Sequence, residues 1–254
     1  VDLIRQKTFG GWPDTFPALN LKKVWDVNYN EIRFTAYDFE SQQNIRLRMY
    51  IEQKNGADKP KSIHIHALNE DDWEQFLLAS QLTLGEQLRE EIAIANIKKN
   101  TPINDETKSK LAKKLNGVRN HSEAHITFAP RGVGLSKLTP NKRHNTQTRR
   151  RFMLLGQTLA GQQSFDIIQC IRAIRSLDTY KSIPLELWGK SHTASLITIS
   201  AIFQKDIQKI NLNNYPKTDK EQPDYLNISR FATPLQLLEL AKRNTQVNLI
   251  QHGK

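Results

Sequence analysis

Residues 184–203, PLELWGKSHTASLITISAIF, contain a short strand, a tight turn and a helix in immediate succession. Pro184 to Trp188 have the apolar-rich pattern of a strand, and Ala194 to Phe203 have the small, apolar composition of a buried helix. Between them, Gly189 and Ser191 give the Gly-x-Ser spacing of a nucleophile elbow, in which a tight turn lifts a serine hydroxyl above the edge of a sheet. This context makes Ser191 a candidate nucleophile. The alternative is an ordinary turn in which Ser191 caps the helix.

Strands alternate with helices through the rest of the chain from residue 62 onward, which is typical of a parallel sheet with helices on its faces. Before residue 62, two segments alternate apolar and polar side chains on either side of a polar turn, which predicts an antiparallel hairpin. We therefore expect an α/β fold with a mainly parallel sheet flanked by helices and an antiparallel N-terminal hairpin. The expected hairpin strands are 31–37 and 44–52, and the expected parallel strands are 62–67, 124–129, 184–188, 207–212 and 246–250.

The 254 residues are expected to form a single domain over 1–254. Residues 1–30 contain Gly and Pro and no clear period, which predicts an irregular N-terminal arm. Residues 80–120 are charged and predict a helical excursion over the surface. Because the chain starts with Val1 rather than Met, we expect it to be part of a longer protein.

The longest helical pattern runs over 149–177 and begins with three consecutive arginines, and Gly156 and Gly161 are places where it could bend or break. We expect Phe152 and Leu155 to be buried in this helix. We also expect at least one arginine of 149–151 to make a charge-assisted bond to a carboxylate, because guanidinium groups favour bidentate partners.

The formal net charge of +11 raises the question of an anionic partner. The densest basic cluster joins 142–144 to 149–151, and Phe152 is the one aromatic residue close to it in sequence. Because single-stranded nucleic-acid sites combine cations on one face with stacking aromatics, the sequence disfavours nucleic acid as a partner. There is no apolar run of about 18 residues, so we expect no membrane partner either.

A serine nucleophile also needs a base, an orienting acid and oxyanion donors. Apart from His192, the one histidine after Ser191 is His252, two residues from the end of the chain. Asp219 and Asp224 follow the expected strand 207–212 and are candidates for the acid. Because only two residues follow His252, the loop that would carry its ring back to Ser191 is short. The elbow motif also departs from its usual form, since Thr193 stands where the second glycine is usual.

His64 and His66 alternate on one face of the expected strand 62–67 and could hold a metal. Nearby, only residues 70–72 offer further ligands, so we expect no metal and no cofactor. His66 is a second candidate base, although a base that precedes the serine in sequence is unusual for this elbow.

Several segments, in this order along the chain, resemble the last module of large bacterial acetyl-xylan-esterase-like α/β hydrolases. The resemblance covers most of residues 4–251, and it is carried by AYDFESQ (36–42), RLRMY (46–50), APRGVG (129–134), RRRFMLLGQTL (149–159), DYLNI (224–228) and Thr233-Pro234.

The resemblance implies an α/β-hydrolase fold and an exported carbohydrate-esterase lineage, periplasmic or secreted, in which such a module often follows a catalytic module. It places the nucleophile at Ser191 and the oxyanion donors at the backbone N–H groups of His192 and of the loop around Leu68. Two hypotheses follow. In the first, the module has an incomplete triad and supports a partner catalytic domain of the same parent protein. In the second, it is an active serine carboxylic-ester hydrolase that uses Ser191 on esterified glycans.

Overall fold

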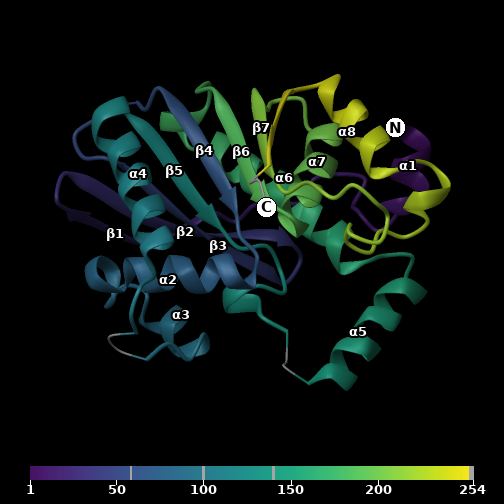
Figure 1. The fold of residues 1–254 in the computed structure, drawn as a ribbon, viewed down its shortest axis with the longest axis horizontal. Coiled ribbons are helices and arrows are strands. Elements are labelled where there is room, and N and C mark those ends of the chain that lie inside the picture. Colours follow the sequence, from purple (N-terminus) through teal and green to yellow (C-terminus); the bar gives the residue numbers. More distant parts are fainter. Residues whose placement is uncertain (58, 99–100, 139–140, 252–254) are drawn as a thin grey trace.

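The computed structural model describes residues 1–57, 59–98, 101–138 and 141–251. One sheet contains eight strands in the order β1-β2-β3-β5-β4-β6-β7-β8 (Figure 1). The strands are β1 (Lys22–Tyr29), β2 (Ile32–Gln42), β3 (Ile45–Lys54), β4 (Ser62–Ala67), β5 (Glu123–Phe128), β6 (Leu185–Lys190), β7 (Lys209–Asn213) and β8 (Gln246–Ile250).

The sheet changes from antiparallel to parallel at β5. Strands β1, β2, β3 and β5 pair antiparallel in turn, whereas β5, β4, β6, β7 and β8 pair parallel. The predicted hairpin and the predicted parallel strands are therefore confirmed. Because the parallel strands share one direction, the turns that follow them lie at one edge of the sheet, where ligands of open α/β sheets bind.

Helices cover both faces of the sheet. One group packs near β3 and β5, the other packs behind β6, β7 and β8, and Figure 1 shows the two groups well apart. The first group is α2 (Glu70–Leu84), α3 (Arg89–Ile94) and α4 (Asp105–His121), and the second is α6 (Leu159–Arg175), α7 (His192–Phe203) and α8 (Pro234–Lys242), with α1 (Asp2–Thr8) beside it. Short 3-10 turns lie at Gly134–Ser136, Asp178–Tyr180 and Ile228–Arg230.

Polar side chains at the helix starts explain where several helices begin. Asn69 caps α2 by accepting from the backbone N–H of Asp72 at 2.8 Å. Thr233 and Gln236 form a reciprocal capping box at α8, in which Pro234 takes the first helical position. Each cap satisfies amide groups that have no partner within the helix.

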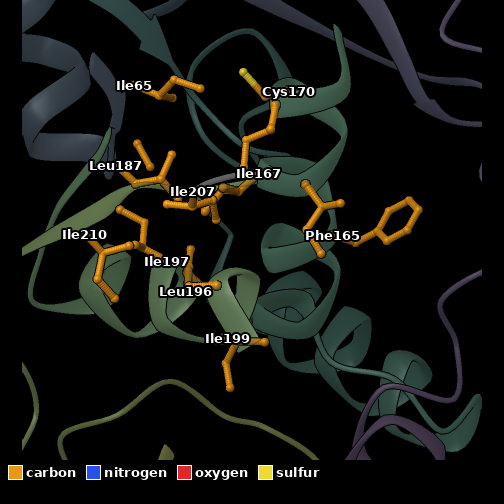
Figure 2. Packing of buried hydrophobic residues seen from close by; sticks show 14 of the residues in the cluster. Ile65, Phe165, Ile167, Cys170, Leu187, Leu196, Ile197, Ile199, Ile207 and Ile210 are labelled. Carbon is orange, nitrogen blue, oxygen red and sulfur yellow. The ribbon is translucent and has the colours of Figure 1, made fainter. Parts of the chain in front are cut away.

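The larger apolar core lies between the parallel strands and α6 and α7. Ile65, Leu187 and Ile210 project from three neighbouring strands toward the helices, and all three are fully buried (Figure 2). The helices contribute Phe165, Ile167, Cys170, Leu196, Ile197 and Ile199 to the same layer. This packing fixes α7, and with it the turn at the start of α7, relative to the strands.

Two expectations about the elements differ from the structure. Residues 1–30 are not irregular throughout, because they contain α1 and the edge strand β1. The expected long helix is two helices, α5 (Lys142–Leu154) and α6, separated by a turn in which Gly156 has a φ of +68°. Leu155 lies at this break and is 72% exposed, so the prediction that it is buried is wrong, whereas Phe152 is half-buried.

Candidate active site

Ser191 lies between β6 and α7, at the carboxyl edge of the parallel strands, as the sequence predicts. Its backbone has φ +51° and ψ −108°, a conformation that a non-glycine residue rarely adopts. Its N–H donates to the carbonyl of Asn213 at the end of β7 (2.8 Å), and its side chain is exposed and makes no capping bond to α7. The strained backbone and the exposed hydroxyl are the geometry of a nucleophile elbow rather than of a helix cap.

Gly189 and Thr193 close the turn around Ser191. A Cβ atom on Gly189 would lie 2.5 Å from Cδ1 of Ile197 and 2.9 Å from the backbone of Thr193, so a side chain has no room there. Thr193 is fully buried, and its hydroxyl accepts from the N–H of Lys190 (2.8 Å) and donates to the carbonyl of Lys190 (3.1 Å). The turn therefore accommodates a β-branched residue because the hydroxyl satisfies backbone groups of the turn itself.

The ring of His192 is held by α6. Nε2 of His192 lies 3.1 Å from Oε1 of Gln163, while the amide group of Gln163 donates to the carbonyl of Arg131 (2.8 Å). The amide oxygen of Gln163 is thus the acceptor, and Nε2 of His192 carries the proton. The backbone N–H of His192 belongs to the first turn of α7, where amides have no helical acceptor, so it fits the predicted oxyanion role.

Both predicted acids have partners other than Ser191. Asp224 accepts from Nε of Arg149 at 2.6 Å, and Asp219 accepts from the side-chain amide of Gln222 at 3.1 Å. The Arg149 contact confirms the expected bond between the arginine cluster and a carboxylate. His252, the predicted base, lies outside the described residues.

Two asparagines at the end of β7 were not anticipated. The chain leaves β7 through Asn213 and Asn214, and Asn214 has a φ of +50°. In this elbow architecture the acid follows a late strand, so two amides stand close to the place where a carboxylate would follow β7. The sequence NLNNYP (211–216), which spans the end of β7 and the residues after it, contained this signal.

Leu68, the second predicted oxyanion donor, has a different partner. Its backbone N–H donates to the carbonyl of Phe128 at 2.9 Å and so extends the pairing of β4 with β5. This N–H is therefore occupied in the structure.

A buried pair beside the turn was also missed from sequence. Arg131 follows β5, and its guanidinium contacts both carboxylate oxygens of Asp166 in α6 at 2.5 and 2.8 Å. Asp166 also accepts from the hydroxyl of Ser41 and from the N–H of Arg131. The pair anchors the β5–α5 connection against α6, next to Gln163, so it is part of the structure that holds the ring of His192.

Three histidines form a network on the polar face of the sheet, in which His66 and His125 are hydrogen-bonded and the ring of His64 stacks on that of His125 with centroids 4.9 Å apart. His66 Nε2 lies 3.0 Å from His125 Nδ1, and His125 Nε2 lies 3.0 Å from Glu123. The indole N–H of Trp188 donates to Nδ1 of His64 at 3.1 Å. Burial lowers the pKa of each histidine below its ordinary value, so all three are neutral at pH 7.

The neutral network fixes the tautomers. Because Glu123 accepts from Nε2 of His125, Nδ1 of His125 is an acceptor and Nε2 of His66 carries the proton. No group of three or more His, Cys, Asp or Glu side chains within the described residues is arranged to hold a metal ion.

Comparison with known proteins shows which folds this chain is similar to. No family model matches the chain, and a search of curated proteins finds no match. Solved structures do match. A Bacteroides fragilis protein described as a candidate acetyl xylan esterase has a TM-score of 0.62 at 12% identity, over 98% of this chain and 72% of the other. Acetyl xylan esterase 1 from Thermoanaerobacterium has a TM-score of 0.54 at 9% identity, over 100% of this chain and 85% of the other.

The chain has an acetyl-xylan-esterase-like α/β-hydrolase fold. A CE15 glucuronoyl esterase from Teredinibacter turnerae shares this fold with a TM-score of 0.52 at 11% identity, over 83% of this chain and 49% of the other. The chain thus spans about half the length of that esterase. Within the acetyl-xylan-esterase-like fold, Ser191 occupies the strand-to-helix elbow. Among the described helices, none is both long and apolar enough to span a membrane.

Proposed function

We propose that this domain is a carbohydrate-esterase-type module with an incomplete Ser-His-Asp triad that supports a partner catalytic domain of the same parent protein. The observation that carries the proposal is that the candidate acids and bases are paired with groups other than the Ser191 hydroxyl. Each described candidate for the acid or the base has its own partner elsewhere: Asp219 with Gln222, Asp224 with Arg149, His192 with Gln163, and His66 with His125. A serine hydroxyl without a base is a weak nucleophile at neutral pH.

The asparagines at the end of β7 support the same proposal. A neutral amide at Asn213 or Asn214 cannot stabilise an imidazolium as a carboxylate does. His192 donates its Nε2 proton to Gln163, and no hydrogen bond joins its ring to the hydroxyl of Ser191 among the described residues. From the resemblance to exported carbohydrate esterases, we also propose that the parent protein is exported to the periplasm or secreted. Cell fractionation tests this proposal.

A second candidate function is an active serine carboxylic-ester hydrolase that uses Ser191 on acetylated or otherwise esterified glycans. The observation in its favour is the strained backbone of Ser191, with its hydroxyl exposed. Strain of this kind persists where the surrounding structure enforces it and is concentrated at functional sites.

Hydrolysis of p-nitrophenyl acetate and of acetylated xylan distinguishes the two candidates. We expect equal, near-background rates from the unmodified chain, from Ser191→Ala and from the control Ser182→Ala, which changes an exposed serine before β6. Loss of a triad member from an active serine hydrolase costs several orders of magnitude in rate. Turnover that disappears in Ser191→Ala but persists in Ser182→Ala would establish the enzyme and overturn the proposal of an incomplete triad.

A further inference from the structure

Helix α5 stands away from the rest of the molecule in Figure 1, at the lower right. It connects β5 to α6, so it leaves the sheet at the same edge as the Ser191 elbow. Arg149 ties it to the segment after β7 through Asp224, a second connection at that edge (2.6 Å). Helix α5 therefore follows the same edge of the sheet as the Ser191 elbow.

The two sides of α5 differ in exposure. Asn145, Thr148 and Phe152 recur every three or four residues and are half-buried, so they form the side that faces the molecule. Arg143, Gln147, Arg150 and Leu154 recur at the same spacing on the outer side, and all are exposed. His144 and Arg151 lie next to this row and are also exposed. We call these six residues the outer face of α5.

The outer face is cationic and is not neutralised locally. The sequence of α5, KRHNTQTRRRFML, has no Asp or Glu. Arg149 pairs with Asp224, but within the described part of the chain no salt bridge is found for Arg143, Arg150 or Arg151. Arg143 and Arg150 are two helical turns apart, about 10.5 Å along the axis at 1.5 Å per residue. Such a row suits an extended polymer with repeated negative charges, because each guanidinium can bind one carboxylate or sulfate in bidentate fashion.

We propose that the outer face of α5 binds an acidic polysaccharide, a glycan with carboxylate or sulfate groups, and holds it next to the Ser191 edge. The charge of the face calls for a polyanion, and the choice of a glycan among polyanions rests on the proposed function as a carbohydrate-esterase-type module.

The chemistry of the face argues against two other polyanionic partners. Single-stranded nucleic acid is held by bases stacked on aromatic side chains, and Phe152, the aromatic residue of α5, is on the inner side. An anionic membrane binds helices with an apolar stripe along their length. In α5 the exposed apolar side chains are confined to the last turn and the residue after it, at Leu154 and Leu155. There they can cover the apolar C–H face of a sugar ring.

The test measures binding of the whole chain to polygalacturonate by titration calorimetry at low and at physiological salt. The variant carries Arg143→Gln, Arg150→Gln and Arg151→Gln, and glutamine preserves helix propensity while removing charge. The matched control carries Lys181→Gln, Lys205→Gln and Arg243→Gln. These three exposed cations precede β6, β7 and β8 and so lie toward the opposite edge of the sheet. Circular dichroism verifies that both variants are folded.

We expect salt-sensitive binding that weakens by about tenfold or more in the α5 variant and by much less in the control. Neutral xylan, double-stranded DNA and vesicles of phosphatidylglycerol are titrated in parallel, and we expect each to bind more weakly than polygalacturonate. Equal losses in the two variants would overturn the proposal, as would tighter binding of DNA or vesicles, or no binding of polygalacturonate. No ester is turned over in this assay, so its result is independent of whether Ser191 is active.

Discussion

At the scale of single residues, the elbow depends most directly on Gly189. A Cβ there would meet the side chain of Ile197 and the backbone of Thr193 within 3 Å, and the backbone cannot give way without moving α7. We expect Gly189→Ala to lower the free energy of unfolding by about 1–3 kcal/mol, and Gly189→Ser by more. Urea denaturation measures both.

Gly56 is the matched control for this prediction. It has a φ of +73°, and a Cβ there would have nothing within 4 Å. Its replacement therefore costs only backbone strain, about 1 kcal/mol, whether the new residue is Ala or Ser. If the cost at Gly189 were no larger and did not grow with side-chain size, the close approach of α7 to β6 would be contradicted.

The residues of the site differ in how far the sequence could reveal them. Gly189 and Ser191 were predicted because the elbow is local: strand, turn and helix are consecutive. Gln163 was missed because it reaches His192 from another helix, and no spacing in the sequence indicates that contact. Thr193 looked like a defect in the motif, since the bonds of its hydroxyl to Lys190 depend on the folded turn.

At the scale of elements, the buried pair Arg131–Asp166 holds the β5–α5 connection to α6. Asp166 is fully buried, and Arg131 is 9% exposed. We expect Asp166→Asn to lower the free energy of unfolding by about 3–5 kcal/mol, because it leaves the guanidinium buried without its counter-charge. Chemical denaturation measures the change.

The exposed pair Arg149–Asp224 provides the comparison. Its side chains are 59% and 58% exposed, so solvent screens the interaction. We expect Asp224→Asn to change the stability by less than about 1 kcal/mol. Similar losses in both variants would show that the environment of Asp166 is not the dry one that its burial indicates.

The division between α5 and α6 shows where a periodic pattern misleads. Apolar residues continue through Phe152 and Leu155, and so the sequence indicated one long helix. The structure ends α5 at Leu154 and begins α6 after Thr158, whose hydroxyl accepts from the N–H of Gly161 at 3.1 Å. Gly156 indicated a possible break in the sequence, and Thr158, two residues later, was the further signal for the start of a new helix.

At the scale of the whole molecule, the mainly parallel sheet and its antiparallel hairpin could be predicted. Before residue 62 apolar and polar side chains alternate along the strands, and after it strands alternate with helices. The edge strand β1 could not, because its burial pattern is exposed at both ends and carries little periodic signal. The histidine network could be predicted only in part. The alternation of His64 and His66 with buried isoleucines shows that both lie on one face of β4, but their contact with His125 depends on a strand some 60 residues later.

This network makes the stability of the molecule depend on pH. Burial lowers the pKa of His64, His66 and His125 in the folded state, whereas an unfolded histidine has a pKa of about 6.5. Below about pH 6.5 the unfolded chain therefore takes up protons that the folded protein does not, and stability falls as the pH falls. Each fully neutral histidine contributes up to about 1.4 kcal/mol per pH unit.

Urea denaturation at pH 7.0 and at pH 5.5 tests this dependence. Both pH values lie above the range in which carboxylates ordinarily titrate, so the histidines are the groups that change charge. We expect the unmodified chain to lose about 2–3 kcal/mol between the two values, chiefly through His66 and His125. In His66→Asn one titrating group is gone, so the loss should shrink by about 1 kcal/mol even though the variant is less stable at both pH values. The control is His144→Gln, which changes an exposed histidine of α5 and should leave the loss as it is in the unmodified chain. A loss as large in His66→Asn as in His144→Gln would mean that His66 is protonated in the folded state, and the tautomers assigned to the network would then be wrong.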